Sequence, residues 1–311
     1  DIWYHVIRTG KFIAYNSLVI IKMANFFKVS SKNRTLGQHL TLTIERLDLN
    51  GCGVARYQKK PVFIENTLPG EKVSIKIIEH KNKYFRGKLL TVEQKSAKRV
   101  TPQCQHYQLC GGCDLQHLAL SEQQDFKQQK VTNLFQRNDI AADLPWQKMI
   151  TSMPWHYRRK TRIGVQYDKV GQVTLGFRQK STNQLTTIKS CPVLVEPITA
   201  VFKPLISLLN QLTLTRSVGH IEMVVTDKVT IVVRQLKKQN LADKTLWLEY
   251  AQKYHWQVVS YDGEVYSPLT AISGLHFMLP EMVKLAFEVS DFIQINQQVN
   301  HQMIEQAMQW L

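Results

Sequence analysis

Acidic residues are scarce in this sequence. Its 311 residues include 24 Asp and Glu against 40 Lys and Arg, which gives a formal net charge of +16 at pH 7. Such an excess favours a polyanionic partner, and nucleic acid before membrane, because no basic amphipathic helix stands out. The alternative is a basic protein whose charge only keeps it in solution.

Long hydrophobic runs are also missing. The longest near the start, residues 18–21, is closed by Lys22, whereas crossing a bilayer takes about 20 apolar residues. We therefore expect no membrane-spanning segment, no membrane partner and a cytoplasmic location. The 44% hydrophobic and 21% charged residues are typical of a folded protein, and the length suits about two domains.

Neither end of the sequence is typical of a domain boundary. The chain begins at Asp1, a plausible start is Met23, and residues 1–22 lack the small-residue cleavage site of a signal peptide. The other end, at Leu311, falls within an expected helix. We interpret residues 1–22 as a non-native or upstream extension, and the chain as a fragment of a longer protein.

Residues 23–99 carry much of the positive charge, with 16 Lys and Arg against 6 Asp and Glu, a net charge of +10. Short β-type runs in this segment alternate with turns such as 48–53 and 68–71. This pattern predicts a small, OB-like β-barrel. A barrel of this charge is typical of an RNA-binding module, and a basic but passive barrel is the alternative. The expected strands are 40–47, 54–57, 61–64, 72–78 and 84–92.

Residues 100–290 mix helical and strand patterns, which predicts an α+β chain with an antiparallel α/β central domain. The first helix should begin with Ser121 as its N-cap and Gln124 three positions later. Asp227-Lys228 should form the turn of a hairpin. Further strands are expected at 162–167, 173–178, 185–189, 221–225, 229–234 and 256–261, and helices at 121–137, 196–212, 241–253 and 299–311.

Four of the five cysteines have a spacing that predicts a metal centre. Cys104, Cys110 and Cys113 form a C-x5-C-x2-C cluster, and Cys191 follows far along the chain, before Pro192. Four thiolates suit tetrahedral zinc or a [4Fe–4S] cluster, and three close cysteines with a distant fourth favour iron–sulfur. A disulfide framework is disfavoured because nothing marks the chain as secreted.

The remaining candidate ligands are surplus to a four-thiolate site. Cys52 lies in a Gly-x-Gly turn, and we expect it to be unligated and structural. His106 and His117 flank the cysteine-rich loop, where we interpret them as local hydrogen-bonding groups.

Several motifs together resemble the RNA uracil-5-methyltransferase family. The run from Cys110 to His117, Cys-Gly-Gly-Cys-Asp-Leu-Gln-His, is similar to the iron–sulfur signature of the family, and Cys191-Pro192 to its fourth ligand. Residues 42–92, with Gly-Cys-Gly-Val-Ala-Arg at 51–56, resemble its TRAM domain, an RNA-binding barrel. Segments 154–160, 175–178 and 291–296 are also similar, so the resemblance covers residues 23–311.

The resemblance implies a substrate and two cofactors. Members use S-adenosylmethionine to make 5-methyluridine, and the TRAM domain and the [4Fe–4S] cluster favour the branch that acts on 23S rRNA. A tRNA-directed relative is the alternative within the family.

The resemblance also implies a missing part. A Rossmann-like methyltransferase domain, with a glycine-rich turn, a nucleophilic cysteine and a general base, should follow segment 291–296, so residues 291–311 would be the start of a truncated domain. A thiolate must add to uracil before C5 can be methylated, and a base must then remove the C5 proton. Because Cys191 is the last cysteine, we expect no catalytic residue here and an inactive fragment.

A basic run is the candidate phosphate-binding surface. Arg158, Arg159, Lys160 and Arg162 lie close together in sequence, and we expect them to hold RNA phosphates. The alternative is a solvated strand edge.

Aromatic and amide residues are candidates for contacts with bases. Tyr157 and Phe177 could stack on unpaired bases or belong to the core. The resemblance implies that Gln294 touches the cofactor or the target base, and that Phe292 packs against a flipped uracil. Ordinary interdomain packing is the alternative for Phe292.

Two helices should expose apolar surface. The resemblance implies that helix 119–140 packs on the missing catalytic domain. Without that domain, this helix and 299–311 would expose apolar side chains and favour self-association.

Two other functional classes are open to the same residues. One is a stand-alone RNA-binding module with a structural metal. The other is a radical or redox iron–sulfur enzyme, which is disfavoured because the C-x3-C-x2-C spacing of radical enzymes is absent.

Overall fold

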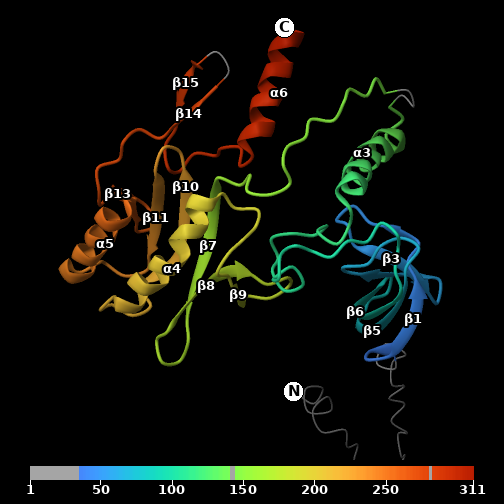
Figure 1. The fold of residues 1–311 in the computed structure, drawn as a ribbon. Coiled ribbons are helices and arrows are strands. Elements are labelled where there is room, and N and C mark those ends of the chain that lie inside the picture. Colours follow the sequence, from blue (N-terminus) through green and yellow to red (C-terminus); the bar gives the residue numbers. More distant parts are fainter. Residues whose placement is uncertain (1–34, 141–143, 280–281) are drawn as a thin grey trace, which may run out of the picture.

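The fold is that of a computed structural model, which describes residues 35–140, 144–279 and 282–311. The expected extension at residues 1–22 lies outside the described residues. The first six strands form a small barrel, and the next seven form a larger sheet with helices packed on it (Figure 1).

The barrel comprises strands at the positions expected from the alternating pattern. Its side chains point alternately inward and outward, and the inward set includes Val62, Ile64, Ile75 and Phe85, all fully buried. The strands are β1 (His39–Thr43), β2 (Arg46–Leu47), β3 (Gly53–Tyr57), β4 (Lys60–Ile64), β5 (Lys72–His80) and β6 (Phe85–Gln94).

The barrel closes because the segment 39–47 pairs first with β5, through β1, and then with β3, through β2. The strand order is β1-β5-β6-β4-β3-β2, so the consecutive strands β1 and β2 stand at opposite ends of the sheet. Between them, the Ile44 amide donates to the Glu71 carbonyl and the Glu45 amide donates to the Val54 carbonyl, at 2.9 and 2.8 Å. The short link therefore joins both ends of the sheet.

Helix α3 (Leu120–Arg137) has no buried residue. Its N-cap is Ala119, with no side-chain hydrogen bond, so the expected cap at Ser121 is wrong. Ser121 lies in the first turn because the Ala119 carbonyl already accepts the Gln123 amide, at 2.9 Å.

The central sheet is mixed, and the expectation of an antiparallel domain is wrong. Its order is β13-β12-β11-β10-β7-β8-β9, and β11 pairs with β12 in parallel. Helix α5 (Leu241–Tyr254) connects these two strands, as parallel neighbours require. The strands are β7 (Lys160–Tyr167), β8 (Val173–Arg178), β9 (Leu185–Thr187), β10 (Val218–Val225), β11 (Val229–Gln235), β12 (Gln257–Tyr261) and β13 (Tyr266–Pro268).

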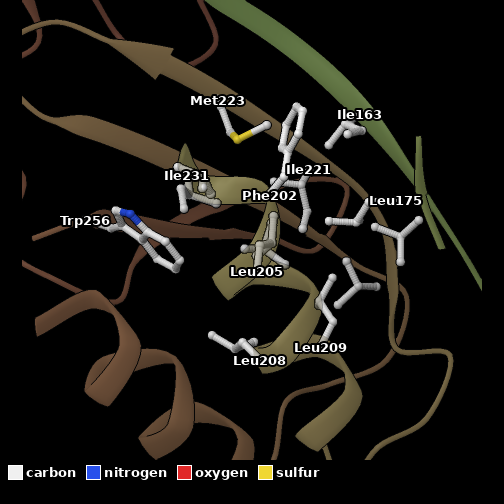
Figure 2. Close-up of a cluster of buried hydrophobic side chains, with 14 of the residues drawn as sticks. Ile163, Leu175, Phe202, Leu205, Leu208, Leu209, Ile221, Met223, Ile231 and Trp256 are labelled. Carbon is white, nitrogen blue, oxygen red and sulfur yellow. The ribbon is translucent and has the colours of Figure 1, made fainter. Parts of the chain in front are cut away.

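Two helices cover one face of this sheet. Phe202 and Leu205 of α4 (Glu196–Gln211) pack against Ile221, Met223 and other strand residues (Figure 2). Trp247 and Ala251 of α5 extend the same buried cluster. This core fixes the strands from β7 to β12 as one platform.

The other face is covered only in part. Val224, Val232 and Val259, which alternate with the core residues, pack under Leu275 and Ile293. The covering segment includes a two-stranded sheet of β14 (His276–Met278) and β15 (Lys284–Ala286), and leads into α6 (Gln297–Trp310). In the described part of the chain, no helix is long and apolar enough to cross a membrane.

Candidate metal centre and RNA-binding surface

The four predicted cysteine ligands line one cavity. It measures about 170 Å³, and Cys104, Cys110 and Cys113 reach it from one loop while Cys191 reaches it from another. Local hydrogen bonds fold the first loop: the Cys110 amide donates to the His106 carbonyl at 2.8 Å. Residues far apart in sequence thus line the same cavity.

The second loop is fastened to the start of the central sheet. The amides of His156 and Arg158 donate to the carbonyls of Pro192 and Val193, both at 2.8 Å, and the Leu194 amide donates to the Cys191 carbonyl at 3.1 Å. These bonds hold Cys191 in place independently of any ligand.

Three of the thiols that line the cavity hold their protons more firmly than a free cysteine does. Burial raises the pKa of the Cys110, Cys113 and Cys191 thiols, and the charge of neighbouring cysteines of the same group raises it further. A metal must therefore displace protons from these thiols, so loading is favoured at higher pH. Among the described residues, no group of three or more His, Cys, Asp or Glu side chains is arranged to hold a metal ion as it stands.

Cys52 is separate from this group. It lies in the barrel, where the Asp48 carboxylate accepts its backbone amide at 2.8 Å. Burial and the nearby Asp48 raise the pKa of Cys52 to about 12. Its thiol is therefore neutral, which agrees with a structural role.

His117 and Tyr107 join the cysteine loop to the barrel. Both are buried, and the Tyr107 hydroxyl lies 2.6 Å from the Nδ1 atom of His117. Burial, together with the charge of Arg99, lowers the pKa of His117 to about 4. The ring is therefore a neutral hydrogen-bonding group, as the sequence predicted for it.

An ion pair that the sequence did not reveal reinforces the same junction. Glu71 is fully buried, and Arg99 binds both of its carboxylate oxygens at 2.5 and 2.7 Å. Arg99 also donates to the Asn66 carbonyl at 2.8 Å. Neither residue stands out in sequence, because the two partners lie 28 positions apart and no motif marks them.

The basic run does not form one exposed patch. Arg158 lines the cysteine cavity. The Lys160 amine donates to the carbonyls of Val289 and Asp291, at 3.2 and 2.6 Å. Arg162 keeps a side chain that is 64% exposed, beside Glu222 at 3.8 Å.

Arg159 departs from its expected role as a phosphate ligand. It is only 5% exposed, its guanidinium lies over the Phe277 ring at 5.0 Å, and its Nε atom donates to the Gln294 carbonyl at 3.2 Å. The expectation fails because the distant segment 289–296 folds over Arg159, which directly precedes β7. Arg159 positions that segment and does not face solvent.

The segment held by Arg159 presents two of the other predicted residues. The Phe292 side chain is 83% exposed, and Gln294 is exposed as well. Packing within the described residues therefore does not occupy Phe292. Tyr157 and Phe177 are half-buried, and Phe177 packs partly against the central core.

Comparisons with known proteins identify the family. The sequence matches the TRAM domain over residues 33–90. A curated relative from Colwellia psychrerythraea, named 23S rRNA (uracil(1939)-C(5))-methyltransferase RlmD, is 52% identical over 317 residues and covers 93% of this chain and 68% of its own length. The chain belongs to the RlmD family. Further RlmD proteins, from Shewanella woodyi and Aliivibrio fischeri, are 37% and 38% identical and cover 93% of this chain, with 66% of their own length matched.

These comparisons also correct the expected fold class. The structure of the Pyrococcus abyssi tRNA (uracil-54, C5)-methyltransferase, in complex with S-adenosyl-L-homocysteine, matches with a TM-score of 0.63 at 17% identity. The match covers 86% of the RlmD-family chain and 64% of that structure. Because the fold matches a methyltransferase over this length, a fold class defined by a missing Rossmann-like methyltransferase domain is overturned. The comparisons likewise give no support to the expected truncated, inactive fragment.

Proposed function

We propose that this RlmD-family chain recognises 23S rRNA for methylation of a uracil at C5, with S-adenosylmethionine as the methyl donor and 5-methyluridine as the product. The curated relatives that match nearly the whole chain are named for this reaction. In this proposal the TRAM domain is assigned to residues 23–99, the central domain to 100–290 and the methyltransferase part to 291–311.

The single observation that carries the proposal is the convergence of four cysteines. Cys104, Cys110, Cys113 and Cys191 surround one cavity beside the central sheet, and their donor chemistry fits a [4Fe–4S] cluster. The cluster would have a structural task, because four thiolates leave no iron open to substrate. It would connect the 101–118 loop with the Cys191 loop and so fix the surface that meets RNA.

The RNA contacts are assigned to exposed groups. Arg162 offers an exposed guanidinium to phosphate, whereas Arg158 and Lys160 support the neighbouring segments. Phe292 would pack against the flipped uracil and Gln294 would touch the cofactor or the base, since both side chains are exposed on one short segment. We assign no catalytic residue, because the fifth cysteine, Cys52, holds its proton.

An anaerobic purification followed by an absorbance spectrum and metal analysis tests the proposed cluster. We expect a brown protein with about four irons and four sulfides per chain. A colourless protein with zinc would replace the cluster by a zinc site and favour a stand-alone RNA-binding module.

Binding of RNA tests the substrate. We expect tighter binding to a 23S rRNA fragment that contains the modified uridine than to a tRNA of equal length, measured at one fixed salt concentration. Equal or tighter binding to tRNA would contradict the rRNA assignment.

A further inference from the structure

A second cavity lies directly beside the cysteine cavity. It measures about 720 Å³, and three residues line both: Gly112, Arg162 and Phe177. We call it the glycine cleft, because five of the 14 glycines of the chain line it. These are Gly111, Gly112, Gly164, Gly176 and Gly219.

The cleft lies over strands β7, β8 and β10, beside the cysteine loop. Gly164 of β7 pairs with Gly176 of β8 on one side and with His220 of β10 on the other. These positions alternate with the core residues Ile163 and Ile221, so they face away from α4 and α5. The segment 272–293 covers this face only further along the strands.

The glycines keep the floor of the cleft at backbone level. A Cβ atom on Gly176 would overlap the carbonyl oxygen of Thr186, and one on Gly111 would lie 3.0 Å from the carbonyl oxygen of Arg178. Close approach of neighbouring backbones therefore excludes a side chain at Gly176 and leaves little room for one at Gly111. A ligand in the cleft meets the peptide backbone and a few long side chains.

The charge of the cleft is positive. Its lining contains Arg162 and Arg178 but no Asp or Glu. Within the described residues, the exposed Arg178 side chain has no ion-pair partner. Arg162 donates to the Nδ1 atom of His220 at 3.1 Å, and only Glu222, at 3.8 Å, opposes its charge. Two arginines with this freedom fit the oxygens of phosphate groups.

Polar groups at the rim of the cleft can form hydrogen bonds with a base. The Gln166 side chain donates to the Asn183 carbonyl at 2.8 Å and accepts the Leu185 amide at 3.2 Å, which holds the 183–185 loop in place. The exposed side-chain amide of Asn183 is left to donate and accept at the opening of the cleft. Amides of this kind pair with the edges of unpaired bases.

We propose that the glycine cleft binds unpaired nucleotides of the RNA substrate, with Arg162 and Arg178 on the phosphates and Asn183 on a base. The inference rests on the proposed function and adds to it a location and two residues, Arg178 and Asn183. The charge of the cleft favours a polyanion as its occupant, because its lining has no carboxylates and the chain has a net charge of +16. A single strand fits because its bases are open to contact with the residues that line the cleft.

The cleft and the cysteine loop share one wall. The Gly111 amide donates to the Arg178 carbonyl at 2.9 Å, and the Lys180 amide donates to the Leu109 carbonyl at 3.2 Å. The backbone that carries Arg178 is thus bonded to the loop that carries Cys110. A metal in the cysteine cavity would fix this wall and, through it, the position of the arginine.

The test is fluorescence anisotropy with the metal-loaded protein and a labelled single-stranded RNA of about 12 nucleotides. We expect R162A and R178A each to weaken binding by about three- to tenfold, and to lower the slope of log affinity against log salt by about 0.7, the value of one lost phosphate contact. N183A should weaken binding without changing that slope, because it removes no charge.

The matched control is K203A. Lys203 is an exposed residue of α4, on the opposite face of the sheet, and its removal takes away one positive charge. We expect affinity within about twofold of the unmodified protein.

Three outcomes would overturn the proposal. If R178A behaves like K203A while the unmodified protein binds RNA, the cleft is not an RNA site, although the proposed function stands. If inorganic polyphosphate displaces the RNA as well as unlabelled RNA does, the cleft recognises anions alone. If the unmodified protein binds neither this RNA nor a 23S rRNA fragment, the proposed function fails as well.

Discussion

At the scale of single residues, two cysteines with different surroundings make a matched pair. Cys110 lines the cavity with three other thiols, whereas Cys52 lies alone in the barrel with a pKa of about 12. We expect C110S to weaken metal binding by more than about tenfold and to remove the visible absorbance. C52S should retain both. Metal analysis of the two purified variants checks this, and equal metal content in both would refute the ligand assignment.

The buried pair of Glu71 and Arg99 gives a second prediction at this scale. Removing one partner leaves the other charge buried without compensation, so we expect E71Q to lower the free energy of unfolding by about 3 kcal/mol. E93Q is the control, because Glu93 is half-exposed and lies 3.9 Å from Lys72. Urea unfolding at pH 7 measures both, and a similar small loss for the two variants would contradict the prediction.

The same pair gives a dependence on pH. Burial alone would raise the pKa of Glu71, but hydrogen bonds from Arg99 and from two backbone amides outweigh it and lower the pKa below its ordinary value of 4.5. A carboxyl with a lowered pKa stabilises the fold above its unfolded pKa, and this stabilisation is lost as pH falls below about 4.5. The unfolding free energy of the unmodified protein should therefore drop below that pH more than that of E71Q. Parallel acid dependence in both proteins would exclude Glu71 as a cause.

Sequence alone located the cysteines but not the neighbours that define their surroundings. The C-x5-C-x2-C spacing is local, so the grouping with Cys191 could be inferred. The burial of Arg159 could not, because it depends on Phe277 and on the carbonyl of Gln294, more than a hundred positions away. The run of basic residues in the sequence therefore predicted a larger exposed basic surface than the structure has.

At the scale of elements, α5 depends on a capping residue. The Asn240 side chain accepts the Asp243 amide at 2.8 Å and donates to the Thr213 hydroxyl at 2.7 Å. We expect N240A to lower the free energy of unfolding by about 1 kcal/mol. N183A is a suitable control, because its side chain caps no helix. Thermal unfolding followed by circular dichroism measures both, and an unchanged midpoint for N240A would argue against the cap.

Helices α3 and α6 expose apolar side chains, as the sequence predicted. Leu134 is 56% exposed and Trp310 is 72% exposed. If these faces drive self-association, L134E should shift the protein towards the monomer in sedimentation equilibrium without changing its unfolding midpoint. The control is L241E, since Leu241 is 80% exposed at the start of α5. A purely monomeric unmodified protein would contradict the expectation.

Long periodic elements were predictable, whereas most of the three-residue strands were not; β9, within the expected strand 185–189, is the exception. The apolar stripe of α4 and the alternation in β10 and β11 are visible in the sequence, whereas β13, β14 and β15 have three residues each. The parallel pairing of β11 with β12 was also missed. The sequence does contain a sign of this parallel pairing. The expected strand, helix and strand follow one another with short connections, an order typical of a parallel crossover.

At the scale of the whole molecule, the cysteine centre connects parts of the chain that are otherwise joined by few bonds. We expect metal removal by a chelator to raise amide hydrogen exchange in residues 101–118 and 190–194, since their loops lose their common anchor. Strands β5 and β6 should keep their protection because their core is separate. Mass spectrometry of the exchanged peptides checks this, and equal gains in the barrel would show that the metal stabilises the whole fold.

The order of strands in the central sheet affects the way in which copies of this protein can aggregate. Its outermost strands, β9 and β13, are the shortest in the sheet, with three residues each, and β13 ends at Pro268, which has no amide hydrogen. A second chain therefore finds few free backbone groups along which to extend the sheet. When copies of this protein aggregate, we expect amorphous precipitates held by side chains, and not fibrils with a cross-β repeat.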